Sequence, residues 1–494
     1  MEIFLSAIVG ELTTRSINFF ISKLSKPPLL SDVEDRLHRV LLRAQVIVDE
    51  AMERHITNRA MLQQLDMLRD AMHRGYYMLD TFRYQSHNKE EAKDQIVSHS
   101  SLLSKVNPAK DLCFSGGTSA QILEEMQKAL DSLSSMILDV NKLVQFLASY
   151  SRMYRQPYSM HLLLSKCMFG RQMETQLVIN FLLHRHPQGT EELEVLPIVG
   201  PGRVGKSTLV SHVCNDERVR NYFSNIIFLS ANDFSNGELS ALGKGYVMKH
   251  KNCMSNKEGR MLVVVEVAGV FNEVAWKRLY SASKQCLSSG SKIIITSRSD
   301  KITKVGTTQA VTLKYLSQEA YWYFFKTLTF GGTDPEMHPR LAYMAMEIAR
   351  VLNGALISAN ISACLLSDNF DVRFWCKVRA FLRGFLWTYV SKFGEHPSDV
   401  LDQNKPTPLE IMDRTFEEVM VYHQYQLSSQ EEVPKVTIQD VVYGGVKPPG
   451  RFEVLAWRSQ IPPYYNYIYT CEIRDLKTKA TKRKRSMRNG VTLP

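Results

Sequence analysis

The strongest constraint on the fold is a glycine-rich loop set between a strand-like and a helix-like segment. The stretch "LEVLPIVGPGRVGKSTLVSHV", residues 193–213, contains the pattern G-x-x-x-x-G-K-S. Glycines let the backbone turn tightly and point its N–H groups inward, where those groups and the following helix N-terminus favour phosphate. Lys206 would reach the terminal phosphates, and the Ser207 hydroxyl is placed for a magnesium ion. The alternative is a glycine-rich turn without a ligand, which the strand–loop–helix setting disfavours. We therefore expect a nucleotide-binding loop formed by Gly200, Gly202, Arg203, Val204, Gly205, Lys206, Ser207 and Thr208.

The segments around this loop predict a parallel sheet. Short runs rich in β-branched residues alternate with helical stretches between about 160 and 312. Such alternation is typical of parallel strands joined by crossover helices. We expect a doubly wound P-loop domain over residues 160–312, with strands in "LEVLPIVG", "NIIFLSA", "MLVVVEV", "SKIIITS" and "AVTLKYL".

Residues 1–150 are predicted to be helical. Apolar residues recur at helical spacing in four stretches, the first within residues 1–24, and four amphipathic helices make a bundle the expected arrangement. A polar gap is expected near 86–117. The pattern alone favours a self-contained helical domain over a helical interaction module.

The remaining chain divides into three parts. Residues 313–390 return to helix and are rich in aromatic side chains. Residues 391–475 form a mixed region without assignment, in which "KVTIQDVVYGG" and "FEVLAWRS" resemble strands. Residues 476–494 form a basic tail that we expect to be disordered. Chain length, at about 100–200 residues per domain, fits such a multidomain α and α/β protein.

The net charge is concentrated in the tail. The chain carries +11, of which +7 lies in residues 477–494, a stretch with no acid. The folded part is therefore only mildly basic, and nucleic-acid binding is not expected beyond the tail. Its "KRKR", residues 482–485, is typical of a nuclear-import signal, although a solvated tail has the same composition.

Cysteine usage and hydropathy bear on location. The eight cysteines form no C-x-x-C pair, which favours a reduced, cytoplasmic compartment over a disulfide framework or a zinc knuckle. No apolar run reaches the length of a membrane span, and the start of the chain lacks the basic leader of a secretory signal. We expect a cytoplasmic protein, with a nuclear location if the tail is an import signal.

Glu266 is the single acid of the aliphatic run "MLVVVEV" and is the candidate catalytic residue. Magnesium at such a site needs a carboxylate close to the serine hydroxyl, directly or through water. Glu266 could hold the metal, in which case Val267 fills the catalytic position, or it could be the catalytic acid, in which case Val265 fills the metal position. Strand alternation excludes both at once. A third interpretation is a strand-end acid without a role.

Two further segments contain candidate nucleotide-binding residues. Arg298 follows the strand "SKIIITS", and an arginine at that strand end can reach the γ-phosphate side of the site, or it can be a surface residue. Phe169, Gly170 and Arg171 precede a helix, and Phe169 could lie over a purine. A linker helix that packs on the core is an equally good interpretation of their spacing.

Together these motifs resemble plant NLR disease-resistance proteins of the coiled-coil NB-ARC type. "FGRQME" resembles the linker motif, "GSKIIITSR" the sensor strand, and "YLSQEAYWYFFKTLTFG" the helix block that follows. The resemblance covers roughly residues 1–365. It implies a helical signalling bundle, a nucleotide-binding core and a helical ARC subdomain over residues 313–390. It further implies an ADP/ATP switch in pathogen sensing, protein partners through the bundle, and self-association or pairing with another such protein.

The chain departs from the family pattern at several places. The acidic pair of the second nucleotide-binding block is reduced to Glu266, and Leu356 stands where the family has a proline. The acidic motif of the helical domain keeps only Leu79 and Asp80. No Met-His-Asp motif occurs at the expected place, leucine-rich repeats are not found, and the resemblance ends near residue 370.

Three functions are compatible with these motifs. The first is a divergent or truncated regulator that binds ADP or ATP, with or without Mg²⁺, and is at most a slow ATPase. The second is an active ATPase that uses Glu266. The third is a nuclear, nucleic-acid-associated protein that acts through its basic tail.

Overall fold

The computed structural model describes residues 30–52, 54–98, 119–147, 149–151, 164, 168–184, 193–229, 246–249, 259–267, 271–402, 405–427, 431–461 and 464–476. By its internal contacts the chain separates into two compact units. Unit 1 comprises Met1–Met160 and Leu316–Arg350, and unit 2 comprises His161–Tyr315 and Val351–Pro494. The expected first helix, within residues 1–24, and the basic tail, residues 477–494, lie outside the described residues.

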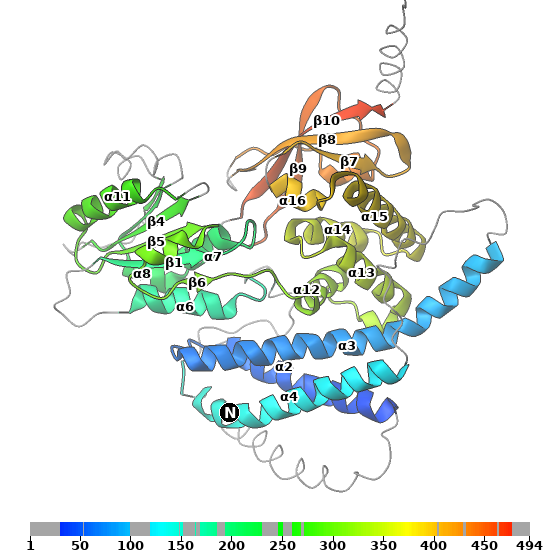
Figure 1. Cartoon of the computed structure of the whole chain (residues 1–494), viewed down its shortest axis with the longest axis horizontal. Coiled ribbons are helices and arrows are strands. Elements are labelled where there is room, and N and C mark those ends of the chain that lie inside the picture. The colour runs from blue at the N-terminus through cyan, green and yellow to red at the C-terminus, as the bar shows by residue number, and fades with distance from the viewer. Residues whose placement is uncertain are drawn as a thin grey trace, which may run out of the picture. The chain divides into compact units, whose positions relative to one another are not determined.

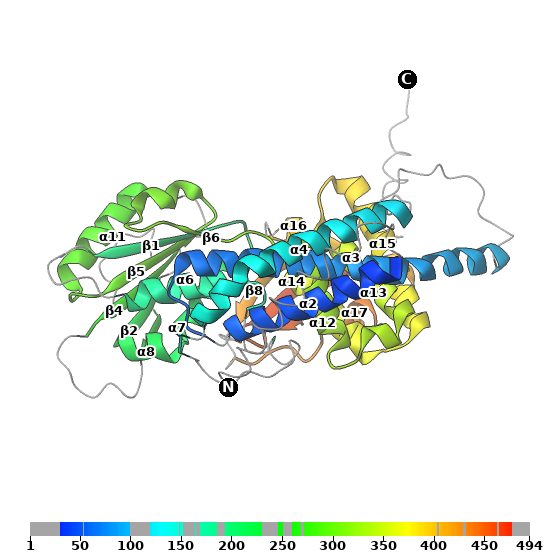
Figure 2. The ribbon, with the colours of Figure 1, turned by 90° about the horizontal axis from the view of Figure 1, so that it is seen from below.

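Three N-terminal helices of unit 1 run side by side (Figure 2). They are α2 (Leu30–Met52), α3 (Arg59–Ser98) and α4 (Ser119–Leu147). On α2, Val33, Leu37, Leu41 and Ala44 are fully buried, which is the three-and-four spacing of one helix face. A Cβ added to Gly75 of α3 would lie 2.7 Å from Leu41 Cδ2, so glycine permits this close approach of α2 and α3. Helix α3 continues into the expected polar gap because "HNKEEAKDQ" is rich in helix-forming residues.

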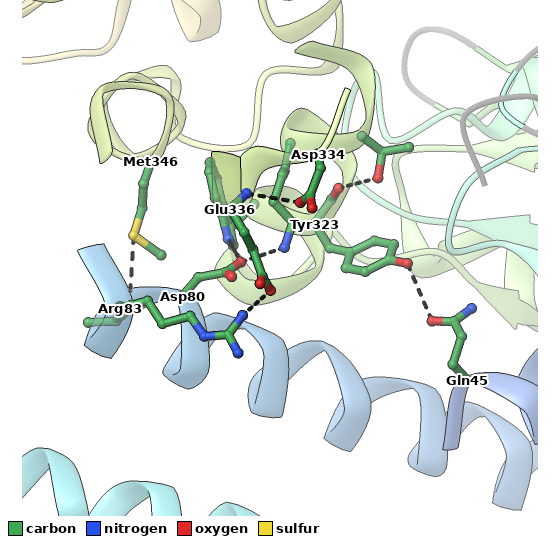
Figure 3. Close-up of polar contacts among 11 residues, drawn as sticks. Gln45, Asp80, Arg83, Tyr323, Asp334, Glu336 and Met346 are labelled. Atoms are coloured by element: carbon green, nitrogen blue, oxygen red, sulfur yellow. Dashed lines mark hydrogen bonds and ion pairs between the residues drawn. The ribbon is translucent and has the colours of Figure 1, made fainter. Parts of the chain in front are cut away.

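The first helices after residue 315 also belong to unit 1. They are α12 (Gln318–Phe330), the 3-10 turn η2 (Pro335–Met337) and most of α13 (Pro339–Leu352). Asp80 of α3 is buried, and its carboxylate accepts hydrogen bonds from Trp322 Nε1 at 2.7 Å and Lys326 Nζ at 2.5 Å (Figure 3). One turn further along α3, Arg83 pairs with Glu336. The N-terminal helices are thus joined to α12 through a buried charged contact.

The core of unit 2 is a six-stranded sheet with the order β3-β2-β4-β5-β1-β6 (Figure 1). All neighbours are parallel except β3, which is antiparallel to β2. Val199 on β1 and Val267 on β4 both lie opposite Ser297 on β5, so these three strands end at one edge of the sheet. The strands are β1 (Glu194–Val199), β2 (Asn225–Leu229), β3 (Tyr246–Lys249), β4 (Met261–Val267), β5 (Lys292–Ser297) and β6 (Val311–Thr312).

Helices cover both faces of this sheet, as Figure 1 shows. On one face, Leu262 and Val264 of β4 share a hydrophobic cluster with α6 (Gln172–Leu183), α7 (Lys206–Cys214) and α8 (Glu217–Tyr222). On the other, Val263 and Val265 pack in a second cluster with α11 (Glu273–Cys286) and the 3-10 helix η1 (Asp300–Val305). The strict alternation along β4 follows from the period of two in a strand.

The second part of unit 2 combines helices with an antiparallel sheet. The helices are α14 (Leu356–Asp368), α15 (Val372–Phe393), α16 (Pro397–Asp402) and α17 (Ile438–Val442). The sheet has the order β7-β8-β10-β9 and consists of β7 (Thr407–Ile411), β8 (Arg414–Leu427), β9 (Arg451–Arg458) and β10 (Asn466–Asp475).

One predicted strand is wrong. "KVTIQDVVYGG" forms the helix α17 because Thr437 and Asp440 make a capping box, in which each side chain bonds the other residue's backbone N–H. By contrast, "FEVLAWRS" supplies β9, as the sequence predicts.

The expected fold class is confirmed. The chain combines N-terminal helices with a doubly wound, mainly parallel P-loop core, and each predicted strand of the core is present. The domain boundaries drawn from the sequence stay a prediction. Within the described part of the chain, no helix is both long and apolar enough to cross a bilayer.

Candidate nucleotide-binding site

The glycine-rich loop joins β1 to α7 at the edge where the parallel strands end. Gly205 has a φ of 94° and is the N-cap of α7, so the helix begins directly at Lys206. A Cβ at Gly200 would lie 2.4 Å from the backbone oxygen of Leu313, a contact that no side chain tolerates. These glycines are therefore required by the path of the backbone, which presents N–H groups at a helix N-terminus in the manner of a phosphate cradle.

Lys206 folds back over this loop. Its Nζ donates to the carbonyl oxygens of Gly200 at 2.8 Å and Pro201 at 2.6 Å. The pKa of Lys206 is lowered to about 8, mainly by burial and also by the nearby charge of Arg298, while the charge of Glu266 acts in the opposite direction. A phosphate at this loop would supply the negative charge that this ammonium group needs, so the electrostatics favour an anion.

Ser207 and Glu266 face each other across the site. The Ser207 Oγ donates a hydrogen bond to Glu266 Oε1. The strand explains this contact, since Glu266 shares a face of β4 with Leu262 and Val264, and that face packs against α7. Glu266 therefore lies beside Ser207, and its role as metal ligand, catalytic acid or neither stays a prediction.

This pair could hold a magnesium ion only together with other ligands. One hydroxyl and one carboxylate supply two of the about six oxygens that Mg²⁺ requires. Among the described residues, no group of three or more His, Cys, Asp and Glu side chains forms a metal site. Nucleotide phosphates and water would have to complete the coordination.

Arg298 is brought to the same site. It follows the end of β5, and its guanidinium carbon would lie 3.2 Å from a Cβ placed on Gly202. Arg298 is exposed and acts on the charge state of Lys206, so the two cations share one electrostatic environment. The position suits contact with a phosphate group that approaches the loop from solvent.

The segment before α6 supports the loop from behind. Arg171 is buried, and its guanidinium bonds the backbone oxygens of Val204, at 3.5 Å, and Lys314, and pairs with Glu174 at 3.1 Å. Arg171 therefore positions the loop in this structure. Gly170, with a φ of 67°, makes the turn before it, and the half-buried Phe169 stays a predicted purine contact.

The other predicted loop residues have different surroundings. Val204 is buried in the core beneath the loop. Arg203 has a φ of 53° and donates to the backbone oxygen of Leu401, in α16, at 3.2 Å. The Thr208 hydroxyl bonds that of Tyr467, on β10.

Sequence reasoning missed three residues at this loop. Tyr315 donates its hydroxyl to the Gly202 oxygen at 3.3 Å, and it lies within the predicted strand "AVTLKYL", which is the one available signal for it. Leu401 and Tyr467 belong to the region without assignment. They are distant along the chain from the loop, and no motif there points to it.

Comparison with known proteins agrees with this geometry. Residues 172–334 match the NB-ARC domain family. The disease resistance protein RGA2 of Solanum bulbocastanum is 24% identical over 395 residues, which cover 76% of this chain and 38% of that protein. The putative disease resistance RPP13-like protein 1 of Arabidopsis thaliana is 23% identical over 400 residues, which cover 76% of this chain and 37% of that protein.

A third relative is similar over a shorter stretch. The putative disease resistance protein RGA1 of Solanum bulbocastanum is 27% identical over 226 residues, which cover 43% of this chain and 23% of that protein. The chain thus spans well under half the length of each of these relatives. The loop, the parallel sheet and these similarities lead to one conclusion: the chain carries an NB-ARC domain and is homologous to plant disease-resistance proteins of the NLR class.

Proposed function

We propose that this chain is an ADP- or ATP-binding, switch-type regulator of the plant defence response that hydrolyses ATP slowly or not at all. The observation that carries the proposal is the pairing of a complete phosphate loop with a single acid, Glu266, bonded to Ser207. The relatives' names as disease-resistance proteins supply the defence role.

Binding and hydrolysis make different demands on this site. ADP is held by backbone N–H groups and by Lys206, because these groups complement phosphate charge without help from a second carboxylate. Hydrolysis also needs an oriented and activated water. Glu266 is bonded to Ser207 and the flanking Val265 and Val267 are buried on the other face, so no second acid of β4 is available for that task.

Protein partners are part of the proposal. Leu42 and Val46 lie one turn apart on α2 and are 51% and 52% exposed, although most apolar side chains of α2 are buried. An exposed pair at this spacing suits contact with another helix, either of a partner or of a second copy. A cytoplasmic location belongs to the proposal as well, supported by the free cysteines Cys214, Cys286, Cys364, Cys376 and Cys471.

ATP turnover by the purified full chain tests the hydrolysis part of this function. We expect the unsubstituted chain to bind ATP and to release almost no phosphate over many minutes. Multiple turnovers per minute would contradict the proposal and favour an active ATPase. In that case Glu266→Gln identifies the mechanism, since loss of a general base lowers the rate about 10²- to 10⁴-fold.

A further inference from the structure

The positive charge of the chain outside residues 477–494 is concentrated on one helix, α15. Its 22 residues include five arginine and lysine side chains and no aspartate or glutamate, which gives the helix a charge of +5. The chain carries +11, of which +7 lies in residues 477–494, so all residues outside that segment and α15 together carry −1. A helix that differs so much in charge from the rest of the chain attracts an anionic partner. Its cations are Arg373, Lys377, Arg379, Arg383 and Lys392.

The packing of α15 turns several of these cations to solvent. The buried side chains of the helix recur every three, four or seven residues, which defines one face toward the protein core. They are Trp375, Val378, Leu382 and Tyr389. Arg373, Lys377 and Arg383 are exposed, and helical spacing places them on the opposite side. A Cβ added to Gly384, on that side, would meet no atom of the described residues within 4 Å, so the cationic side of α15 is open.

Large apolar side chains continue this surface toward the C-terminal end of α15. Trp387, Val390 and Phe393 are 56%, 43% and 45% exposed. Their spacing of three residues makes each a neighbour of the next on the helix surface, and Trp387 lies four residues after Arg383. The cationic and apolar parts are therefore contiguous. Exposed apolar residues that lie singly need no explanation, whereas a contiguous group with a charged border is typical of an interaction site.

This combination of side chains favours an anionic lipid surface over a nucleic acid. At the surface of a bilayer, tryptophan and phenylalanine side chains enter the headgroup layer, while lysine and arginine are attracted to anionic lipids. Most protein contacts with nucleic acids go to phosphate and sugar, which offer little to an aliphatic side chain such as Val390. A lipid surface therefore accounts for both parts of the α15 surface, whereas a nucleic acid accounts mainly for the cations.

We propose that the exposed side of α15 is a docking surface for an anionic membrane. Arg373, Lys377 and Arg383 lie against negatively charged headgroups, and Trp387 and Val390 enter the interfacial layer. The helix stays on the surface of the bilayer, because its other side is packed in the protein core. This inference does not require nucleotide binding, so its failure would leave the proposed function intact.

Co-sedimentation of the full chain with lipid vesicles tests the proposal. The chain should bind vesicles of phosphatidylcholine with phosphatidylserine, and bind vesicles of phosphatidylcholine alone far more weakly. Arg373→Gln with Lys377→Gln should weaken binding to the anionic vesicles about thirtyfold, because two cations near the anionic surface are lost. Arg278→Gln with Lys284→Gln is the matched control, since it removes the same charge from exposed positions of α11 and should leave vesicle binding nearly unchanged. Thermal unfolding of both variants checks that each chain is folded.

Tryptophan fluorescence supplies the second readout, since Trp387 is exposed and the other four tryptophans are buried or half-buried. Anionic vesicles should shift the emission of the unsubstituted chain to shorter wavelength, and Trp387→Ala should lose this shift. Vesicle binding that is unchanged in the α15 variants and lost on deletion of residues 477–494 would assign the binding to that segment and overturn the inference. Absence of vesicle binding, with binding of DNA that the same α15 substitutions weaken, would also overturn it.

Discussion

The buried carboxylate of Asp80 offers the sharpest test of how the N-terminal helices are joined to α12. Asp80 is 4% exposed and accepts from Trp322 Nε1 and Lys326 Nζ. The substitution Asp80→Ala removes both acceptor bonds and leaves a largely buried ammonium group and an indole N–H without this partner. The contact between α3 and α12 should weaken most.

The magnitude follows from the contacts. Hydrogen bonds to a charged group contribute about 1.5–3 kcal/mol each, so two lost bonds amount to about 3–6 kcal/mol. The rings of Tyr76, Trp322 and Tyr323 lie 5.5–5.8 Å from Lys326 Nζ and retain part of its stabilisation. We expect a net loss of about 3 kcal/mol in the free energy of local opening, which corresponds to exchange about a hundredfold faster.

Hydrogen exchange with mass spectrometry measures this loss by segment. Peptides from α12 and the middle of α3 should exchange faster in Asp80→Ala, while peptides from β5 should not change. Glu273→Ala is the control, because it removes an exposed ion pair with Lys277 that contributes at most about 1 kcal/mol.

A double substitution isolates the charge. Replacement of both partners of a buried pair by apolar residues is often close to neutral, so Asp80→Leu with Lys326→Met should restore most of the protection. Unchanged exchange of α12 in Asp80→Ala, or an equal effect from Glu273→Ala, would refute the reasoning.

Three further predictions concern single residues. Burial, with the charges of Arg69 and Lys326, lowers the pKa of His73 to about 3. Below pH 6.5 the unfolded chain therefore binds a proton that the folded chain does not, and the free energy of unfolding decreases by about 1.4 kcal/mol for each unit by which the pH is lowered. When the pH is lowered from 7.5 to 5.5, the Tm of His73→Phe should therefore decrease less than the Tm of the unsubstituted chain. Equal decreases in Tm would contradict this prediction. Lys292→Met should lower the free energy of unfolding by about 3 kcal/mol, measured as a lower Tm. Lys292 is only 2% exposed, and its ammonium group bonds one carboxylate and two backbone carbonyls. An unchanged Tm would contradict this prediction. Gly200→Ala should weaken ADP binding at least about tenfold, because its Cβ would meet the Leu313 oxygen. Gly384→Ala, whose Cβ would have no neighbouring atom within 4 Å, should leave ADP affinity unchanged. Similar affinities of the two variants would contradict the prediction that the glycine-rich loop binds ADP.

Much of the parallel core could be predicted because its strands are continuous β-branched runs. A strand buried on both faces has no polar alternation to obscure it, so "MLVVVEV" and "SKIIITS" are distinctive. The short β3 was missed, since its four residues, Tyr246–Lys249, give no such pattern. The helix α17 was missed because a capping box outweighed the β-propensity of its valines.

The site shows where sequence reasoning ends. The role of Glu266 depends on which face of β4 it shares, and that face is known only once the burial partners of Leu262 and Val264 are known. The position of Tyr467 could not be predicted from the sequence for another reason. Its approach to Thr208 depends on tertiary folding, and no local pattern encodes a contact between residues so far apart in the chain.

Nucleotide content tests the central claim, that this chain holds a nucleotide without the acids needed for efficient hydrolysis. The full chain, purified under native conditions and then denatured, should release close to one ADP per chain, identified by mass, and should retain it during magnesium chelation. Lys206→Ala should release none, because it removes the ammonium group that complements the phosphates. Lys277→Ala, at an exposed position of α11, should match the unsubstituted chain. A chain that carries no nucleotide and binds no added ADP, or equal ADP in Lys206→Ala, would contradict the account.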